Sequence, residues 1–323
     1  MSEKRVDGYR HFINKIWNAA RFSLMHFEDG YEDFNLQNLS LPDQWIFSRL
    51  ERVTREVADA LDDYRFNEAA GTLYNFVWHE FCDWYLEAVK PALYDKEDPR
   101  AKESTRAVLW RVLRDTLVLL HPFIPFVTEE IWQHMPGTNG SIMKASYPVQ
   151  MVDAAHTKLL QASESKMGVL MDVITGIRNV RGEMNISPTL ALQVLIQSED
   201  AKVRTVMETH QDLIINLARL SSLEIQNSGK RPKSSATAVV NGASIFVFLE
   251  GVIDFAKETG RLEKEIKKLT VELTAVVKKL NNEGFLSKAP ADVIEKVRAK
   301  QSALLEKQQK IQNNLDRIKD VED

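Results

Sequence analysis

The amino-acid sequence predicts a mainly α-helical protein in three parts: an antiparallel helical bundle, a small α/β module and a C-terminal antiparallel coiled-coil hairpin. Five or six segments of helical periodicity, joined by short loops, precede residue 184. Asn241-Gly242 then separates two short apolar runs, as a hairpin turn does. After residue 257, apolar residues recur every three or four positions in a heptad seam. We therefore expect domains at residues 1–184, 185–256 and 257–323.

Composition is typical of a soluble globular protein. The 323 residues are 44% hydrophobic and 27% charged, which is too apolar for a disordered chain. No run approaches the ~18 apolar residues of a membrane span, and MSEKRVDGYR has no signal-peptide core, so we expect a cytoplasmic protein without a membrane partner. Cys82 is the single cysteine, which excludes intramolecular disulfides and cysteine-based zinc sites. Since the seven histidines are scattered singly, we expect no metal.

Charge is distributed unevenly along the chain. The formal net charge is -4, yet residues 257–319 contain 15 basic and 9 acidic residues, and the first 256 residues carry -7. A basic C-terminal end suits a polyanionic partner, although lysine-rich periodic sequence is more often a solvated helical face.

The first predicted helix, residues 5 to about 27, contains the stretch RHFINKIWNAARF. Its apolar side consists of Phe12, Ile13, Ile16, Trp17 and Ala20. The opposite face carries Asn14, Asn18 and Arg21 at i, i+4 and i+7, beside Lys15 and Phe22. Amides match base edges, cations meet phosphates and a flat ring stacks on a base, so this face suits unpaired nucleic-acid bases. An ordinary amphipathic helix with a polar outer face is the simpler interpretation.

Two further helices follow. Ser40 precedes the second, with Pro42 and the favourable charge of Asp43 in its first turn. The third runs from about Phe66 to Val89 and is stopped by Pro91. It carries an aromatic stripe, for which the core is the default location and a base-stacking edge the alternative: Trp78, Phe81, Trp84 and Tyr85.

The rest of the bundle has clear boundaries. A fourth helix spans about 100–120, and two prolines turn the chain before a short helix begins at Thr128. Residues 137–148 form a crossing loop with one extended piece at Ser141 to Ala145. A long helix from about 152 to 181 completes the bundle.

The pattern changes at Asn185-Ile186-Ser187-Pro188. Strands are expected at 190–196 and 222–226, a helix at 200–220 between them, and a hairpin at 237–248. The basic loop residues Lys230, Arg231 and Lys233 could touch phosphate, but solubilising charge is the commoner role.

The C-terminal segment has the most regular pattern. The first half of its seam is Leu262, Ile266, Leu269, Leu273, Val276 and Leu280. After a break at Asn281 to Gly284 it resumes with Ile294, Val297, Gln301, Leu304, Gln308, Ile311, Leu315 and Ile318. Two seams with a short break predict an antiparallel hairpin, in which the two glutamines weaken the core but fix the register. A coiled coil alone is also compatible with a self-associating scaffold.

Several segments, taken together and in order, resemble the C-terminal half of bacterial valyl-tRNA synthetases, which are class I enzymes. They are KRVDGYRHFINKIWNAARF, LSLPDQWIFSRL, WHEFCDWYLEAVKPALY, HPFIPFVTEEIWQHM with SIMKASYP, IRNVRGEMNISP, and the Lys-rich hairpin with FLSKAP at its turn. The resemblance covers essentially the whole chain. HPFIPFVTEEIW is shared with isoleucyl and leucyl relatives, which leaves the equivalent part of one of those enzymes as an alternative. NKIWNAARF and the terminal arm favour the valyl family.

The resemblance implies a class Ia anticodon-binding domain and a second tRNA contact through the arm. At the anticodon stem-loop of tRNA(Val) it implies Lys15, Asn18, Arg21 and Phe22, with Arg5, Arg10 and Trp84 as further contacts. For both Trp84 and Tyr85, a place in the core is the alternative to contact with the anticodon loop. At the tRNA elbow it implies Lys264, Lys268, Lys278, Lys279, Lys288 and Lys296. Arg178, Arg181, Glu183 and Asn185 match the family's linker motif between bundle and module.

The resemblance also bears on chemistry. Motifs of the HIGH and KMSKS types, which mark the family's adenylate-forming site, do not occur in this sequence. We therefore expect no catalytic residue and no cofactor in this chain, with ATP and Mg²⁺ bound by a catalytic domain preceding residue 1 of an ATP-dependent valine-tRNA ligase. We expect no DNA partner, and a monomer, because an intramolecular hairpin covers its own seam.

Overall fold

The computed structural model describes residues 3–27, 34, 36–148, 154–252, 254–282, 284–285 and 290–322. The chain divides into two compact units, Met1–Val169 and Leu170–Asp323. The division falls inside one long helix, α7, whose second half packs on the sheet of the second unit. The division into three domains expected from the sequence remains a prediction.

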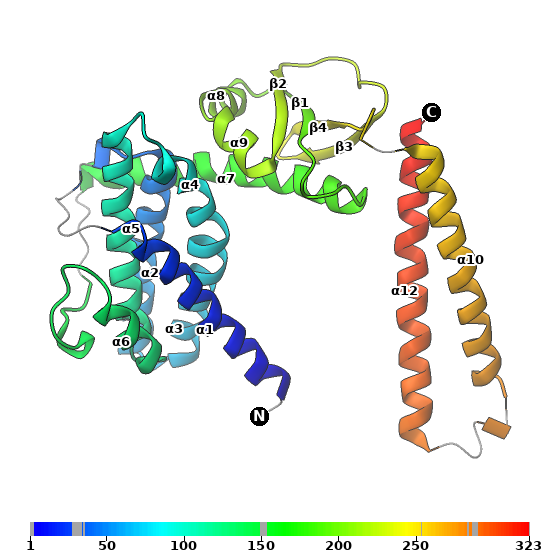
Figure 1. Ribbon diagram of the computed structural model, residues 1–323, viewed down its shortest axis with the longest axis horizontal. Helices are drawn as coiled ribbons and strands as arrows, with labels where there is room; N and C mark the ends of the chain where they lie inside the picture. The colour runs from blue at the N-terminus through cyan, green and yellow to red at the C-terminus, as the bar shows by residue number, and fades with distance from the viewer. Residues whose placement is uncertain are drawn as a thin grey trace. The chain divides into compact units, whose positions relative to one another are not determined.

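The first unit is helical, as expected (Figure 1). Its elements are α1 (Glu3–Leu24), α2 (Leu41–Asp62), α3 (Phe66–Asn75), the π-helix η2 (Phe76–Tyr85), α4 (Leu86–Tyr94), α5 (Pro99–Leu120), α6 (Pro125–Gln133) and the first half of α7 (Ala154–Glu183), with 3-10 turns η1 (Leu36–Asn38) and η3 (Ile142–Lys144). The extended piece expected at Ser141 to Ala145 is wrong. Ser141 instead caps the η3 turn by accepting from the N–H of Met143, while Ile142 is buried.

The start of α2 follows its sequence signals. Ser40 is the N-cap and Pro42 lies in the first turn. Asp43, however, is not a surface charge, because its side chain is completely buried. Its carboxylate accepts hydrogen bonds from Ser40 Oγ (2.6 Å), Tyr85 Oη (2.8 Å) and Thr105 Oγ1 (2.8 Å). Asp43 therefore joins α2 to η2 and α5.

The third predicted helix differs in two ways. It changes to π geometry between Phe76 and Tyr85, and it continues past Pro91, which lies inside α4. A proline removes one N–H donor, and the buried Val89 and Leu93 on either side of it hold the turn in place. The wider π turns rotate later side chains away from the expected stripe, so Phe81 is buried but Trp78 and Trp84 are half-buried.

The second unit contains a four-stranded sheet of order β2-β1-β4-β3. Its elements are β1 (Leu192–Ser198), α8 (Ala201–Thr209), α9 (Gln211–Ala218), β2 (Leu220–Gln226), β3 (Ser235–Val240) and β4 (Ala243–Phe248). β1 and β2 are parallel, and the other pairs are antiparallel. The single helix expected at 200–220 is two helices that meet at His210. Asn241 and Gly242 have φ values of 49° and 76° and so make the expected tight hairpin turn.

α7 approaches the sheet closely at Gly176. A Cβ atom there would lie 2.9 Å from both Ile245 Cδ1 and Val240 Cγ2. One turn earlier, Asp172 accepts a hydrogen bond from the side chain of Asn241. The second half of α7 is therefore part of the core of this unit.

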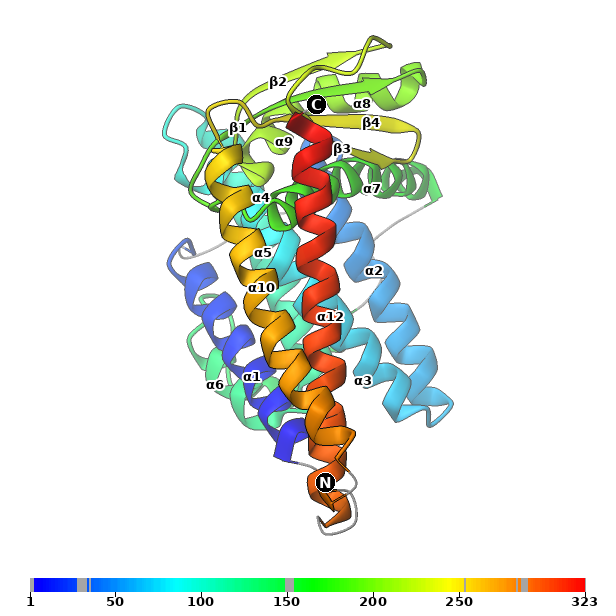
Figure 2. The same ribbon diagram turned by 90° about the vertical axis from the view of Figure 1, so that its right-hand side faces the viewer.

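The arm consists of α10 (Phe255–Leu280) and α12 (Ala291–Glu322), which run side by side in opposite directions (Figures 1 and 2). The predicted seam lies between them, and its most buried members are Leu262, Leu269, Val276, Ile311 and Leu315. Gln308 Nε2 donates to Thr270 Oγ1 at 2.9 Å, so this seam glutamine is hydrogen-bonded across the hairpin. The side chain of Ile318 lies outside the described residues.

Candidate nucleic-acid interface

One side of α1 is exposed and polar. The helix buries Phe12, Ile16, Ala19, Ala20 and Ser23 against the first unit. Arg10, Asn14, Asn18 and Arg21 are exposed on the other side, which is the face that the sequence predicts. The side chain of Arg5 lies outside the described residues. The structure thus brings three predicted contacts, Arg10, Asn18 and Arg21, onto one accessible surface.

Trp17 and Ile13 do not belong to the buried side, contrary to the sequence-based expectation. Trp17 is 42% exposed and Ile13 is 37% exposed, because the elements packed on α1 cover only the opposite part of its circumference. With Arg21, Leu24, Ile131 and His134, Trp17 lines a small pocket of about 150 Å³ between α1 and α6. Trp17 therefore gives the exposed face an accessible aromatic ring at one border, a role that helical periodicity alone did not indicate.

Lys15 lies at the other border and already has partners. Its Nζ atom is 2.5 Å from a carboxylate oxygen of Asp83 and 4.0 Å from the ring centroid of Trp78. Trp78 continues a stack with Tyr74 (centroids 5.6 Å apart), which in turn stacks on Phe12 (4.8 Å). Because Asp83 offsets much of its charge, Lys15 attracts a polyanion less strongly than an unpaired lysine.

Phe22 is the first ring of a row that crosses from α1 to α4. The half-buried Phe22 ring meets His26 edge-on at 4.9 Å, and His26 meets Tyr94 at 5.1 Å. Burial lowers the pKa of His26, and the positive charges of Arg106 and Lys102 lower it further, so the imidazole is neutral at pH 7.

The row ends in an accessible aromatic and a cation. Tyr94 is 60% exposed, and Lys90 Nζ lies 5.7 Å from the centroid of the Phe22 ring. Sequence reasoning missed Tyr94 because the helix was expected to end before Pro91. The exposed face of α1 thus has aromatic rings on both borders.

Trp84 and Tyr85 of η2, for which the sequence left a core position and an RNA contact as alternatives, have different environments. Tyr85 is completely buried and donates to Asp43, so it is a core residue. Trp84 is half-buried, and its contact with RNA remains a prediction.

The predicted arm lysines are at the surface wherever they are described. Lys264, Lys268, Lys278, Lys279 and Lys296 are exposed. Lys288 lies outside the described residues. Near the end of α10, Lys279 Nζ is 4.7 Å from the ring centroid of Phe285.

The linker motif has a structural explanation. The buried Arg181 donates from Nη1 to the carbonyls of Ser187 and Leu190, and from Nη2 to those of Ala218 and Arg219. Arg178 donates twice to the carbonyl of Leu217. Both guanidinium groups therefore satisfy carbonyls at the C-terminal end of α9, where the helix dipole favours positive charge.

Asn185 completes that motif. Its φ of 52° is left-handed, and the N–H of Ile186 then bonds back to the carbonyl of Arg181 at 2.9 Å. Asn185 thus ends α7 and turns the chain toward β1. Glu183 is exposed.

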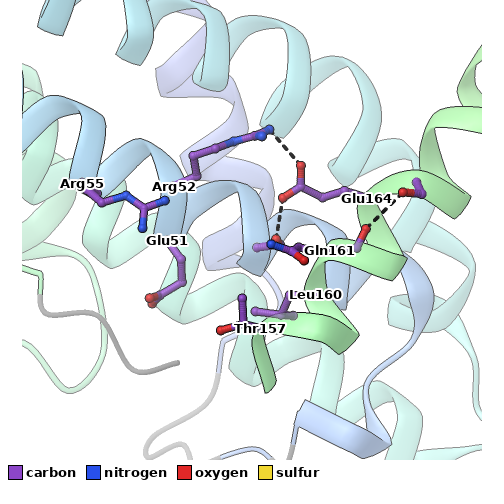
Figure 3. Close-up of a pocket in the computed structure, with 9 residues that line it drawn as sticks. Glu51, Arg52, Arg55, Thr157, Leu160, Gln161 and Glu164 are labelled. Atoms are coloured by element: carbon purple, nitrogen blue, oxygen red, sulfur yellow. Dashed lines mark hydrogen bonds and ion pairs between the residues drawn. The ribbon is translucent and has the colours of Figure 1, made fainter. Parts of the chain in front are cut away.

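A separate pocket of about 430 Å³ lies between α2 and α7 (Figure 3). Glu164 holds its two walls together, because its carboxylate binds Arg52 Nη2 at 2.8 Å and Ser48 Oγ at 2.6 Å. Arg55 and Glu51 add one charge of each sign. With two arginines and two glutamates, this pocket has no excess positive charge for a polyanion.

The described residues offer neither a membrane span nor a metal site. Among the described helices, none is both long and apolar enough to cross a membrane. The described His, Cys, Asp and Glu side chains form no group of three that could hold a metal ion.

Comparison with known proteins identifies two parts of the chain. Residues 43–196 match the anticodon-binding domain of tRNA ligase, and residues 254–319 match the valyl tRNA synthetase tRNA binding arm. α1 precedes the first of these matches, but whole-chain relatives include it.

The valine–tRNA ligase of Geobacter sulfurreducens is 42% identical over 325 residues, which cover 99% of this chain and 36% of that protein. The enzyme of Nitratidesulfovibrio vulgaris is 41% identical over 99% of this chain and 36% of that enzyme. The enzyme of Oceanobacillus iheyensis is 41% identical over 98% of this chain and 35% of that enzyme. The chain thus spans about a third of the length of the curated relatives that it matches. Over nearly its whole length the chain is thus similar to the C-terminal third of valine–tRNA ligases.

Proposed function

We propose that this chain binds tRNA(Val) at two places, with the anticodon stem-loop on the exposed face of α1 and the tRNA elbow on the α10–α12 arm. The observation that carries the proposal is the α1 face itself, where Asn18 and Arg21 lie between the rings of Trp17 and Phe22. Amides and guanidinium groups suit base edges and phosphates, and half-exposed rings suit stacking. The two family matches support the same partner.

The contribution of the chain to aminoacylation is positional. By holding tRNA at both places, it presents the acceptor end to the site where a valine-tRNA ligase attaches valine with ATP and Mg²⁺. That chemistry belongs to a catalytic module, and we assign no catalytic residue, metal or cofactor to this chain. We place this function in the bacterial cytoplasm, where translation takes place, and we propose neither a DNA partner nor a membrane partner.

The arm also bears on the alternative of a self-associating scaffold. The seam of α10 is covered by α12 of the same chain, which supports a monomer. Light scattering at two protein concentrations distinguishes the two, since a scaffold would gain mass at the higher concentration. An isoleucyl or leucyl relative is disfavoured by the match of residues 254–319 to the valyl arm.

Two contacts on one tRNA raise the effective concentration of the second contact, so the arm should add affinity well beyond its own weak binding. The test compares binding of a valine tRNA transcript by the whole chain and by a chain truncated after Phe255. We expect the truncated chain to bind at least about tenfold more weakly. Equal affinities would contradict binding at two places.

A further inference from the structure

The arm has two sides, which one ion pair defines. Lys307 Nζ of α12 lies 3.1 Å from a carboxylate oxygen of Glu265 on α10, so these residues flank the seam on the same side. Side chains three, four or seven positions apart share a helix face. The ion pair therefore determines which other residues of each helix lie on that side.

We name this side the basic side. On α10 it contains Arg261, Glu265, Lys268, Glu272 and Lys279, and on α12 it contains Lys296, Lys300, Lys307 and Lys310. Among the side chains that the structure describes, this side therefore has seven cations and two carboxylates, and all seven cationic side chains are exposed.

The other flank of the seam, the opposite side, has a different composition. On α10 it contains Glu263, Lys267, Thr270, Thr274 and Val277, and on α12 it contains Glu295, Arg298, Ser302, Leu305, Gln309, Gln312 and Asp316. The described side chains there comprise two cations and three carboxylates, and Leu305 is 47% exposed. The positive charge of the arm is thus concentrated on one flank of the seam.

Ion pairing within the arm does not remove this excess. Glu265 binds Lys307 and Arg261, and the hydrogen bond from Lys307 is the largest cause of its lowered pKa. Glu306, on the outer ridge of α12, binds Lys310 at 2.7 Å. Among the described side chains, Lys268 and Lys300 pair with no carboxylate. At a rise of ~1.5 Å per residue, the cations from Lys296 to Lys310 extend over about 20 Å of α12.

We propose that the basic side of the arm is the surface that contacts tRNA phosphates, and that the opposite side faces away from the RNA. The inference rests on the proposed function and adds the orientation of the arm to it. It also divides the lysines predicted for the elbow. Lys268 and Lys296 lie on the basic side with Lys279, whereas Lys264 and Lys278 lie on the outer ridge of α10, away from α12.

The test uses two double variants of the whole chain that remove the same charge. One variant, Lys268→Gln with Lys300→Gln, changes the basic side. The other, Lys267→Gln with Arg298→Gln, changes the opposite side at positions only one or two residues away along the helices. Binding of a valine tRNA transcript is measured over a salt series. The basic-side variant should bind about tenfold more weakly at low salt and reduce the slope of log K against log salt by about 1 to 2. The control should stay within about twofold of the unmodified chain.

The other outcomes separate the orientation from the function. Equal weakening by both variants would mean that overall charge acts, and unchanged binding by both would mean that neither flank touches phosphate; each result overturns the inference while leaving tRNA binding intact. If the unmodified chain does not bind the transcript, the proposed function itself fails, and the inference with it. Circular dichroism melts confirm that the variants keep the helical hairpin.

Discussion

Tyr85 Oη donates a 2.8 Å hydrogen bond to Oδ1 of Asp43, which joins the π-helix η2 to the first turn of α2. Both side chains are completely buried. Ser40 and Thr105 donate to the other carboxylate oxygen, so three hydroxyl groups surround one acid in the centre of the bundle. Burial raises the pKa of Asp43 because it disfavours the charged form, although the three hydrogen bonds act in the opposite direction.

This pKa shift predicts a pH dependence of stability. With the pKa of folded Asp43 above its ordinary value of 3.8, protonation stabilises the folded state at low pH, and that stabilisation is lost as pH rises through the folded pKa. Asp43→Asn cannot titrate. The free energy of unfolding of the unmodified protein, relative to this variant, should therefore fall as the pH rises above the ordinary pKa of 3.8. Urea titrations at several pH values measure it, and a relative stability that rises with pH would contradict the assigned direction.

Arg181 should be important for the stability of the second unit. Its buried guanidinium donates to four carbonyls, and Arg181→Met would remove all four of these hydrogen bonds, although the carbonyl of Arg219 keeps the N–H of Leu192. We expect a loss of about 3 kcal/mol in the free energy of unfolding, measured by urea denaturation. The exposed Arg178 bonds a different carbonyl near the end of α9, that of Leu217, so Arg178→Met is the matched control and should cost about 1 kcal/mol. Equal losses in the free energy of unfolding would show that the burial of Arg181 does not increase its contribution to stability.

Removal of the Asp83 charge should strengthen tRNA binding. Asp83 holds Lys15 at the border of the α1 face, and its own negative charge repels phosphate. Asp83→Asn should tighten binding of a valine tRNA transcript about threefold at low salt. Glu199→Gln removes the same charge at an exposed position of the second unit and serves as the control. A variant that binds more weakly than the unmodified chain would mean that the ion pair helps to shape the interface.

Gln308 should lower the stability of the arm while it fixes the register of α10 against α12. It lies half-buried in the seam and bonds Thr270, so Gln308→Leu replaces a polar seam residue with an apolar one. We expect the free energy of unfolding to rise by about 1 kcal/mol, measured by urea denaturation. Gln309→Leu, at an exposed neighbouring position, should have little effect on it. Destabilisation by Gln308→Leu would indicate that the bond to Thr270 outweighs apolar packing.

Local signals in the sequence predicted much of the fold. Ser40 with Pro42 marks the start of α2, Asn241-Gly242 makes the hairpin, and the heptads place α10 against α12. Each of these depends on residues close in sequence or on a strict period. What periodicity could not predict was where tertiary packing overrides it.

The residues that differ from expectation show this. Asp43 satisfies the rule for a helix first turn, yet it is buried and bonds to Tyr85 and Thr105, which are distant in sequence. The π turns of η2 changed the faces of Trp78 and Trp84, and Trp17 is exposed because its neighbours cover only part of α1. The candidate site was predicted as one helix face, but the ring of Tyr94 and the charge of Asp83 come from other helices.

The proposed function requires that the α1 face reads the anticodon. The most direct measurement is binding of a valine tRNA transcript beside one that differs only in its anticodon, with the unmodified chain, Phe22→Ala, Arg21→Ala and, as a control on α2, the exposed Arg55→Ala. We predict a preference of about tenfold for the native anticodon that Phe22→Ala and Arg21→Ala abolish and Arg55→Ala retains. Equal binding of both transcripts by the unmodified chain, with a steep salt dependence, would contradict it, since phosphate attraction alone would then explain the affinity.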